Sequence, residues 1–350
     1  MDDGRMGAED FGPGKPQEVA EGIYRLEVPL PGNPLKAVNS YVIKGRPRNL
    51  IVDTGMRRSE CREVMAAGLD ALGVRASDTD FFITHFHADH LGLVSDIAAE
   101  TATIYLNRPE IDRILSIGWF ESRFEASARL NGFPEGDMRK AIDRHPARLF
   151  GPRLPLHFTP CHDGEAIHIN GCDFRCIEVP GHSFGHTCLY DEQRKILISG
   201  DHILADITPN LQGWFPDWNP LAHYLKSLDK VAALDVELVL PGHGDVFSDM
   251  LGRIGELKAH HAHRAEEVLA ALLKGQKTAY RVASEITWDI DCDSFDLFPL
   301  AQKWFALGET LAHLIYLESE GRVRREIIED DGRQQALWQI SGQRLPAHRP

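Results

Sequence analysis

The sequence predicts an α/β protein in which helices cover β-sheets, and three observations support this. Short apolar segments with the length of buried strands end repeatedly in glycine or a polar turn. Helical spacing of apolar residues lies between them, for example over Cys61–Leu72 after a capping Ser59. The alternation continues over roughly residues 20–248, which is typical of an α/β architecture. Buried strands are expected at Tyr41–Ile43, Leu50–Asp53, Phe81–Thr84, Ile196–Ser199 and Leu238–Leu240.

Length and composition restrict the class of protein. The 350 residues include 38 basic and 52 acidic side chains, a formal charge of −14, and 43% are hydrophobic. One large domain or two unequal ones with a sizeable core are therefore expected. No apolar run has the roughly 18–20 residues that cross a bilayer, and Met1–Arg5 is too polar for a secretory signal. Six cysteines fit a reduced cytoplasmic enzyme better than a disulfide scaffold.

Three regions depart from the α/β alternation. Residues 1–18 are rich in glycine, proline and charge, which predicts a flexible lead-in. Residues 108–158 are a long connection with helical spacing, which indicates a helical insertion in a domain over 19–250. This insertion is either a lid or a packed helical pair. Over 251–350 the pattern of three helices and a terminal hairpin predicts a small, mostly helical winged-helix-like domain.

The strongest functional signal is a histidine cluster directly after a predicted strand. The cluster contains three imidazoles and one carboxylate within six residues, namely His85, His87, Asp89 and His90. Neutral imidazole and carboxylate are ligands of zinc and similar divalent ions. Because His85 and His87 are two residues apart, an extended backbone aims both at one side. Asp89 and His90 then lie in the following turn, where they can bind a second ion.

Further candidate ligands follow three later strands, where a rigid sheet fixes them and glycine lets an ion approach. They are His182, Asp201 and His243. Seven such residues suit two ions, with three nitrogens on one, a mixed set on the other and a shared carboxylate, for which we select Asp201. We therefore expect two divalent metal ions as cofactors. Zinc is the first choice, and iron and manganese are alternatives because imidazole and carboxylate ligands suit them as well.

This ordered set of motifs resembles the metallo-β-lactamase superfamily over roughly residues 19–248, with Asn39–Tyr41 and Ile51–Gly55 matching flanking strands. The resemblance implies a four-layer αβ/βα sandwich with a dinuclear site at one edge of the two sheets. The core is similar to that of glyoxalase II. The C-terminal residues 251–350 do not resemble the glutathione-binding helices of glyoxalase II. Through Lys277–Tyr280 and Trp304–Glu309 they resemble the winged-helix tail of another branch of the superfamily. This difference argues against glutathione thioesters as substrates.

The resemblance also implies roles for individual residues. The first metal would be held by His85, His87 and His182. The second would be held by Asp89, His90 and His243, with Asp201 bridging the two. Asp89 and Asp201 are the expected catalytic carboxylates, and the residues expected to orient ligands through hydrogen bonds are Asp53 and His186.

Two such ions about 3.5–4 Å apart lower the pKa of a shared water, and the bridging hydroxide then attacks a carbonyl carbon or a phosphorus. A thiolate leaves unaided because a thiol pKa is about 8.5, whereas an amide nitrogen must first be protonated. The sequence therefore favours a hydrolase of thioesters or related acyl esters and lactones. Aromatic residues that would bind the acyl group, or that only fasten the insertion, are Trp119, Phe120, Trp214, Phe215 and Trp218.

Other functions fit parts of this pattern. A phosphodiesterase or nuclease uses the same ligands, and winged helices often bind DNA. Residues 251–350, however, have 13 basic and 15 acidic side chains, and Gly308–Glu320 has no lysine or arginine, so no nucleic-acid partner is expected. The apolar residues of that helix fit packing on the catalytic domain or on a second copy in a homodimer. A β-lactamase or quorum-signal lactonase is chemically permitted, whereas His87 disfavours a redox di-iron module.

Overall fold

A computed structural model describes residues 14–330 and 332–342, except for the side chains at 117–121 and 330. The described chain divides into two compact units. The first contains residues up to 115, 146–209 and 226–254, and the second contains the rest. Each unit is described by itself.

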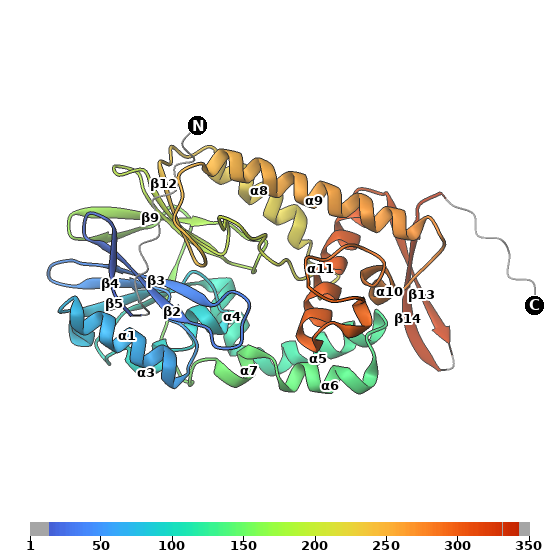
Figure 1. Ribbon diagram of the computed structural model, residues 1–350, viewed down its shortest axis with the longest axis horizontal. Helices are drawn as coiled ribbons and strands as arrows, with labels where there is room; N and C mark the ends of the chain where they lie inside the picture. The colour runs from blue at the N-terminus through green and yellow to red at the C-terminus, as the bar shows by residue number, and fades with distance from the viewer. Residues whose placement is uncertain (1–13, 331, 343–350) are drawn as a thin grey trace, which may run out of the picture. The chain divides into compact units, whose positions relative to one another are not determined.

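Two β-sheets form the frame of the first unit (Figure 1). The first sheet follows chain order, antiparallel from β1 to β4 and parallel from β4 to β7. Its strands are β1 (Gln17–Ala20), β2 (Ile23–Pro29), β3 (Ala37–Ile43), β4 (Asn49–Val52), β5 (Thr79–Phe82), β6 (Ile104–Asn107) and β7 (Thr159–Cys161). The second sheet has the order β12 (Leu238–Pro241), β11 (Ile196–Gly200), β10 (Thr187–Asp191), β9 (Cys172–Glu178) and β8 (Ala166–Ile169). Only β11 and β12 pair in parallel there.

Strand alternation produces two cores in this unit. Successive strand residues point to opposite faces. Leu50 and Val52 of β4 therefore join the core that the two sheets share. Ile51 lies in the core on the other face, with Cys61 and Met65 of helix α1. The sequence thus alternates between the inner and the helix-covered face of one sheet.

Helices cover the outer faces of both sheets. Figure 1 shows α1 (Ser59–Ala71) beneath the first sheet, where it packs on β2. On the second sheet, Ser227 and Lys230 in α8 (Pro220–Ala232) donate to the carbonyl groups of Pro180 and Glu178. The remaining helices of the unit are α2 (Ala88–Leu91), α3 (Val94–Ile97), α4 (Arg108–Leu115) and α7 (Pro146–Phe150), with a 3₁₀ turn at Ala76–Asp78. This order of layers confirms the predicted αβ/βα sandwich.

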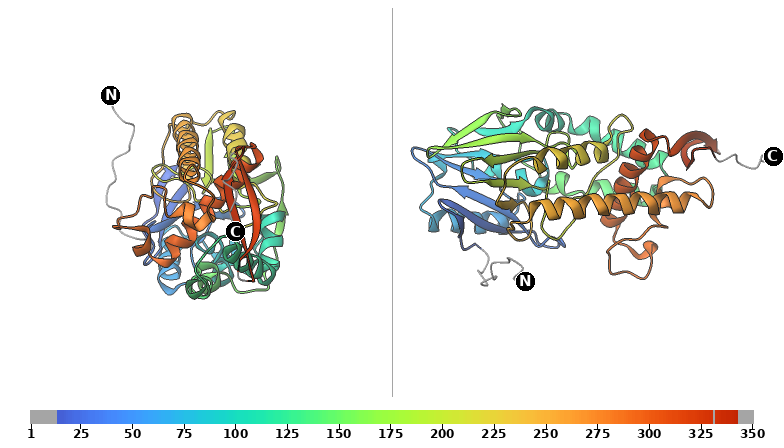
Figure 2. Two further views of the ribbon diagram at one scale, coloured as in Figure 1. Left: turned by 90° about the vertical axis from the view of Figure 1, so that its right-hand side faces the viewer. Right: turned by 90° about the horizontal axis from the view of Figure 1, so that it is seen from above.

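The second unit is helical with a two-stranded sheet. It contains α5 (Ile117–Leu130), α6 (Glu135–Asp143), α10 (Ala279–Ala283), α11 (Leu300–Ser319), most of α9 (Met250–Leu272), a 3₁₀ turn at Phe295–Leu297 and the strands β13 (Val323–Asp330) and β14 (Arg333–Ile340). Figure 2 shows α9 in orange and the hairpin in red. Leu311, Leu314 and Leu317 of α11 are buried, and α11 packs on α6, α10 and β13. The expected homodimer stays a prediction.

The two compact units can be set beside the predicted domain limits, which stay predictions. Residues 17 and 18 of the predicted lead-in over 1–18 belong to β1, while residues 1–13 lie outside the described chain. Helices α4 to α7 occupy the predicted insertion, but residues 116–145 belong to the second unit. The unit boundary falls after Ile254 instead of after residue 250. The winged-helix likeness stays a prediction.

The cysteines and helices bear on the predicted cellular setting. All six cysteines are free thiols. Among the described residues, no helix combines the length and apolar character that crossing a bilayer requires. The cytoplasmic location stays a prediction.

Candidate metal centre

Three histidines from two loops converge on one point with a carboxylate. His85 Nε2 lies 2.9 Å from His87 Nδ1, and His182 Nε2 lies 3.1 Å from the same atom. Oδ2 of Asp201 is 4.0 Å from His85 Nε2 and 3.6 Å from His182 Nε2. These four side chains form the first ligand group, with all four ligand atoms within 4.8 Å of one another.

A second group lies on the other side of the same carboxylate. It consists of Asp89, His90 and His243. Oδ1 of Asp201 is 3.4 Å from His90 Nε2 and 3.5 Å from His243 Nε2. Oδ2 of Asp89 is 3.5 Å from His243 Nε2. The two oxygens of Asp201 therefore face different groups, which is the arrangement of a bridging carboxylate.

Most of these side chains lie just after the carboxyl ends of strands. His85 follows β5, and His90 lies in α2, one turn further along the chain. Asp201 and His243 follow the neighbouring parallel strands β11 and β12, whose carboxyl ends meet at one edge. Between them, Gly242 leaves no room for a side chain, because an added Cβ would lie 2.4 Å from Oδ1 of Asp201 and 3.0 Å from Cε1 of His90. Glycine is therefore a steric requirement at this position.

Hydrogen bonds fix the histidine tautomers. Nδ1 of His243 lies 2.7 Å from the Ala37 carbonyl, which can only accept, so Nδ1 carries the proton. Nδ1 of His90 lies 2.7 Å from Oδ2 of Asp53 and is likewise a donor. When these rings are neutral, both Nε2 atoms therefore have lone pairs aimed at the centre, as metal ligation requires.

Asp53 orients His85 through hydrogen bonds with Thr84. Thr84 donates its N–H and its hydroxyl to the Asp53 carboxylate, each at 2.9 Å. The Thr84 oxygen then accepts from Nδ1 of His85, also at 2.9 Å. Asp53 has a φ of 58°, a conformation that L-residues seldom adopt and that is found at functional sites. On the other side of the centre, Nε2 of His186 accepts the backbone N–H of Asp201 at 3.0 Å.

The electrostatics of the centre favour a cation. Burial, together with neighbouring imidazoles, holds the pKa of His85 well below its ordinary value, so this ring is neutral. For His90 and His243 burial acts in the same direction, but nearby carboxylates outweigh it and raise the pKa of both, those of Asp201 and Asp89 for each ring and that of Asp53 in addition for His90. The same two imidazoles hold the pKa of Asp201 well below its ordinary value despite burial. The carboxylates thus attract positive charge to this point.

Divalent ions fit these ligand groups. The buried atoms His90 Nε2 and His243 Nε2 lie 3.4 and 3.5 Å from Asp201 Oδ1, but none of the three forms a hydrogen bond of good geometry, and a buried polar atom without one costs about 1–3 kcal/mol. A cation among them would satisfy all three. Zinc bonds of about 2.0–2.2 Å in a tetrahedron place ligand atoms roughly 3.3–3.6 Å apart. The measured separations of 2.9 to 4.0 Å lie around this value.

One segment near the centre has the form of a serine nucleophile motif. Gly181–Gly185 has the pattern G-x-S-x-G, which in hydrolases of another fold forms a turn from a strand into a helix. Here the segment joins β9 to β10, which are antiparallel neighbours, and β10 begins at Thr187 with no intervening helix. The structural context of a serine nucleophile is therefore missing at Ser183.

The sequence anticipated every member of the two groups, but it missed residues that support them. Thr84 and the carbonyl of Ala37 were not singled out, because neither belongs to a ligand type. Glu110, a fully buried carboxylate in α4, was also missed. A glutamate at the start of a helix is ordinary in sequence, so only its burial distinguishes it.

The predicted substrate aromatics belong to the second unit. Trp214 is 2% exposed, and its ring stacks on Trp304 with centroids 4.4 Å apart. Phe215 packs on Phe124 at 5.2 Å, and Trp218 stacks on a histidine. The side chains of two further predicted residues, Trp119 and Phe120, lie outside the described part.

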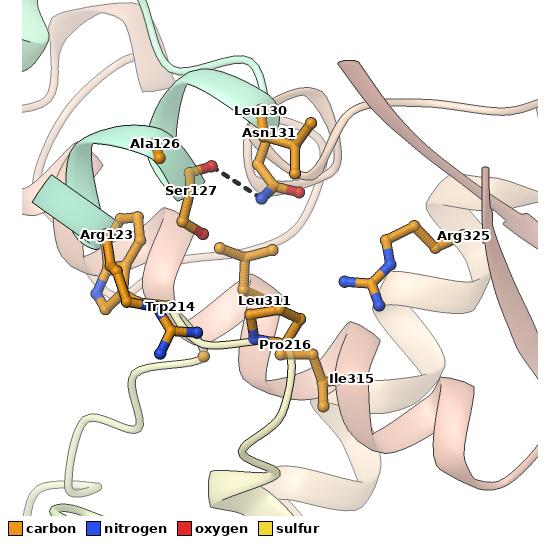
Figure 3. A pocket seen from close by; sticks show the side chains of 11 residues that line it. Arg123, Ala126, Ser127, Leu130, Asn131, Trp214, Pro216, Leu311, Ile315 and Arg325 are labelled. Atoms are coloured by element: carbon orange, nitrogen blue, oxygen red, sulfur yellow. Dashed lines mark hydrogen bonds between the residues drawn. The ribbon is translucent and has the colours of Figure 1, made fainter. Parts of the chain in front are cut away.

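A small pocket in this unit has Trp214 in its wall (Figure 3). Its volume is about 200 Å³, and apolar side chains such as Leu311 and Ile315 line it. Two guanidinium groups, those of Arg123 and Arg325, border it. The interpretation that the aromatics bind an acyl group stays a prediction.

Comparison with known proteins agrees with this architecture. A two-sheet sandwich that gathers two groups of histidine and aspartate ligands at its strand ends defines a class of metal-binding hydrolases. A family model described as the metallo-beta-lactamase superfamily matches residues 33–243, and one described as the metallo-beta-lactamase-like C-terminal domain matches residues 292–334. The chain belongs to the metallo-beta-lactamase superfamily.

Individual relatives share much of the chain. A crystal structure of a metallo-beta-lactamase family protein of Thermus thermophilus covers 92% of this chain and 99% of its own, with a TM-score of 0.74 and 31% identity. The probable metallo-hydrolase YqjP of Bacillus subtilis is 27% identical over 317 residues, which are 86% of this chain and 94% of that protein.

Fungal relatives are longer than this chain. The lactamase-like protein adaB of Aspergillus niger is 25% identical over 264 residues, and the match spans 65% of its length. The atrochrysone carboxyl ACP thioesterase of Emericella nidulans is 24% identical over 251 residues, which are 72% of this chain and 66% of that protein.

Proposed function

We propose that this protein is a dinuclear metal-dependent hydrolase of thioesters or related acyl esters and lactones. The observation that carries the proposal is the position of Asp201, whose two carboxylate oxygens face two separate ligand groups at 3.4 to 4.0 Å. In this proposal the first ion, zinc by preference, is held by His85, His87 and His182. The second is held by Asp89, His90 and His243, and Asp201 joins the two sites.

Bound there, two divalent ions would polarise the substrate carbonyl and supply a nucleophile from water at neutral pH. The chain's own residues provide the geometry. Asp53 and His186 keep the ligands oriented through the hydrogen bonds described above. Asp89 belongs to the second group, and its side chain is 15% exposed. In this proposal one of its carboxylate oxygens holds the second ion and the other accepts the proton that the attacking water releases.

Leaving-group chemistry and one relative support the substrate class. A thiolate departs without protonation because its conjugate acid has a pKa of about 8.5, so these residues suffice for a thioester. The relative from Emericella nidulans is named an acyl-carrier-protein thioesterase. A small-molecule acyl substrate without a nucleic-acid partner is therefore proposed.

A substrate panel tests this proposal. We expect the purified protein to hydrolyse acyl-CoA thioesters and to lose this activity in the presence of a chelator, with close to two metal ions per chain by elemental analysis. The same panel should contain glutathione thioesters, lactones, a β-lactam and a bis-aryl phosphodiester. Turnover of the phosphodiester or the β-lactam alone would contradict the proposed substrate class.

The proposed acyl-binding role of the aromatic residues has its own test. Ala126 lines the pocket that Trp214 borders and is exposed, so Ala126→Phe narrows the pocket without disturbing a core. We expect KM for long-chain acyl substrates to rise about tenfold, with little change for acetyl. The control is Ser122→Phe, at an exposed position of the same helix that does not line the pocket. Equal effects on short and long chains would remove this pocket from substrate binding.

A further inference from the structure

A buried carboxylate connects the two loops that carry the first ligand group. Glu110, near the start of α4, has no exposed surface. Its Oε2 accepts the backbone N–H of Phe86 at 2.9 Å, and its Oε1 accepts the backbone N–H of Gly185. Phe86 lies between His85 and His87, and Gly185 follows His182 by three residues. One side chain thus holds two loops that are about a hundred residues apart in sequence.

Arg113 reinforces this connection one turn further along α4. Arg113 is 6% exposed, and its guanidinium lies over the ring of Phe86 at 5.3 Å and over that of Phe184 at 5.2 Å. Each loop therefore contributes one backbone N–H to Glu110 and one aromatic face to Arg113. Cation–π contacts of this kind are worth about 0.5–2 kcal/mol each.

The fit between α4 and the second loop is close. A Cβ on Gly185 would lie 3.1 Å from Pro109 and 3.3 Å from Cγ of Glu110. The glycine thus lets the loop backbone approach the carboxylate. Burial raises the pKa of Glu110, while the backbone N–H groups of Gly185 and Phe86, the Ser183 hydroxyl and Arg113 favour its charged form. Burying a carboxylate costs free energy unless it is hydrogen-bonded and paired. The contacts of Glu110 with both loops therefore offset the cost of its burial.

We propose that Glu110 is a positioning residue for the metal centre, which holds the Phe86 and Gly185 backbones at the separation where His85, His87 and His182 converge. This inference depends on one part of the proposed function, namely that the imidazoles of His85, His87 and His182 bind a metal ion. It adds a residue that belongs to neither ligand group. The two segments are also joined directly by the Thr187 N–H, which donates to the Thr84 carbonyl at 3.0 Å. Glu110 adds a second connection beyond these strand ends, because its carboxylate accepts one backbone N–H from each irregular segment.

Glu110→Gln tests the proposal because it keeps the shape and removes half of the acceptor capacity. The amide nitrogen would face a backbone N–H, donor against donor. We expect Zn²⁺ affinity, measured by competition with a chromophoric chelator, to fall 10–100-fold, the range typical of residues that orient ligands. Glu110→Asp keeps the charge but is one methylene shorter, so it cannot reach both loops, and it should weaken Zn²⁺ binding as well.

Asp80→Asn is the matched control. Asp80 is 7% exposed and accepts the Thr103 N–H and Nε of Arg48, each at 2.7 Å. It lies at the start of β5, five residues and roughly 16 Å of extended chain before His85. This variant should lose stability but bind Zn²⁺ as the wild type does.

Thermal unfolding separates positioning from plain stability. Bound metal raises Tm by an amount that grows with the logarithm of its affinity for the folded state, so the Tm difference between Zn²⁺-loaded and chelated protein should shrink in Glu110→Gln and persist in Asp80→Asn. Unchanged Zn²⁺ affinity in both Glu110 variants, or an equal loss in Asp80→Asn, would overturn the inference. Absence of Zn²⁺ binding by the wild type would instead overturn the proposed function. If Glu110→Gln does not fold, Glu110→Asp decides the question alone.

Discussion

Replacing Asp201 by alanine should lower kcat more than about 100-fold and reduce the bound metal to at most one ion per chain. The reason is that Asp201 presents one oxygen to each ligand group, so its loss removes a ligand from both sites at once. Substitutions of residues that only orient ligands typically cost 10–100-fold, and a shared ligand should exceed that range. Steady-state kinetics on an acyl-CoA thioester with elemental analysis of the same sample would measure both effects.

The control for this experiment is a buried aspartate that lies outside both ligand groups. Asp191 is 2% exposed and accepts the N–H and Nε of Arg194 at the end of β10. Asp191→Ala should destabilise the fold while the folded fraction keeps its metal and its kcat. If Asp201→Ala retained more than about a tenth of the wild-type kcat, the loss would be below about 1.4 kcal/mol, and the bridging assignment would be wrong.

The sequence carried enough information to predict the ligand groups. Buried strands have short apolar runs, and residues just after them must lie at a sheet edge. The spacing of His85 and His87 directly after such a run therefore indicated a shared target. Asp201 and His243 follow parallel strands that are neighbours in the second sheet, and the resemblance to a known family supplied their pairing with the first motif.

Contacts between distant segments could not be predicted in the same way. Helical spacing in residues 116–145 shows an apolar face but does not identify the surface it packs on, and the structure assigns these residues to the second unit. Glu110 meets Phe86 and Gly185, which are 24 and 75 residues away. No local pattern encodes such a contact, because the geometry that creates it exists only once both sheets have formed.

Gly242→Ala should have an effect close to that of losing a ligand, although the residue has no side chain. An added Cβ would lie 2.4 Å from Oδ1 of Asp201 and 3.1 Å from the carbonyl carbon of Gly200. The carboxylate would have to move away from the second group, or the loop after β12 would have to shift together with His243. We expect the metal content to fall to one ion per chain or fewer and kcat to fall more than about 30-fold.

Gly244→Ala in the same loop separates this steric effect from backbone strain. A Cβ on Gly244 meets nothing within 4 Å, but its φ of 76° is unfavourable for alanine, at a cost of roughly 1–2 kcal/mol. Gly244→Ala should therefore unfold at a lower temperature yet retain two metal ions, whereas Gly242→Ala should lose metal even where it remains folded. Equal metal content in the two variants would show that the centre tolerates displacement of Asp201. The bridging role would then have to be assigned to another group.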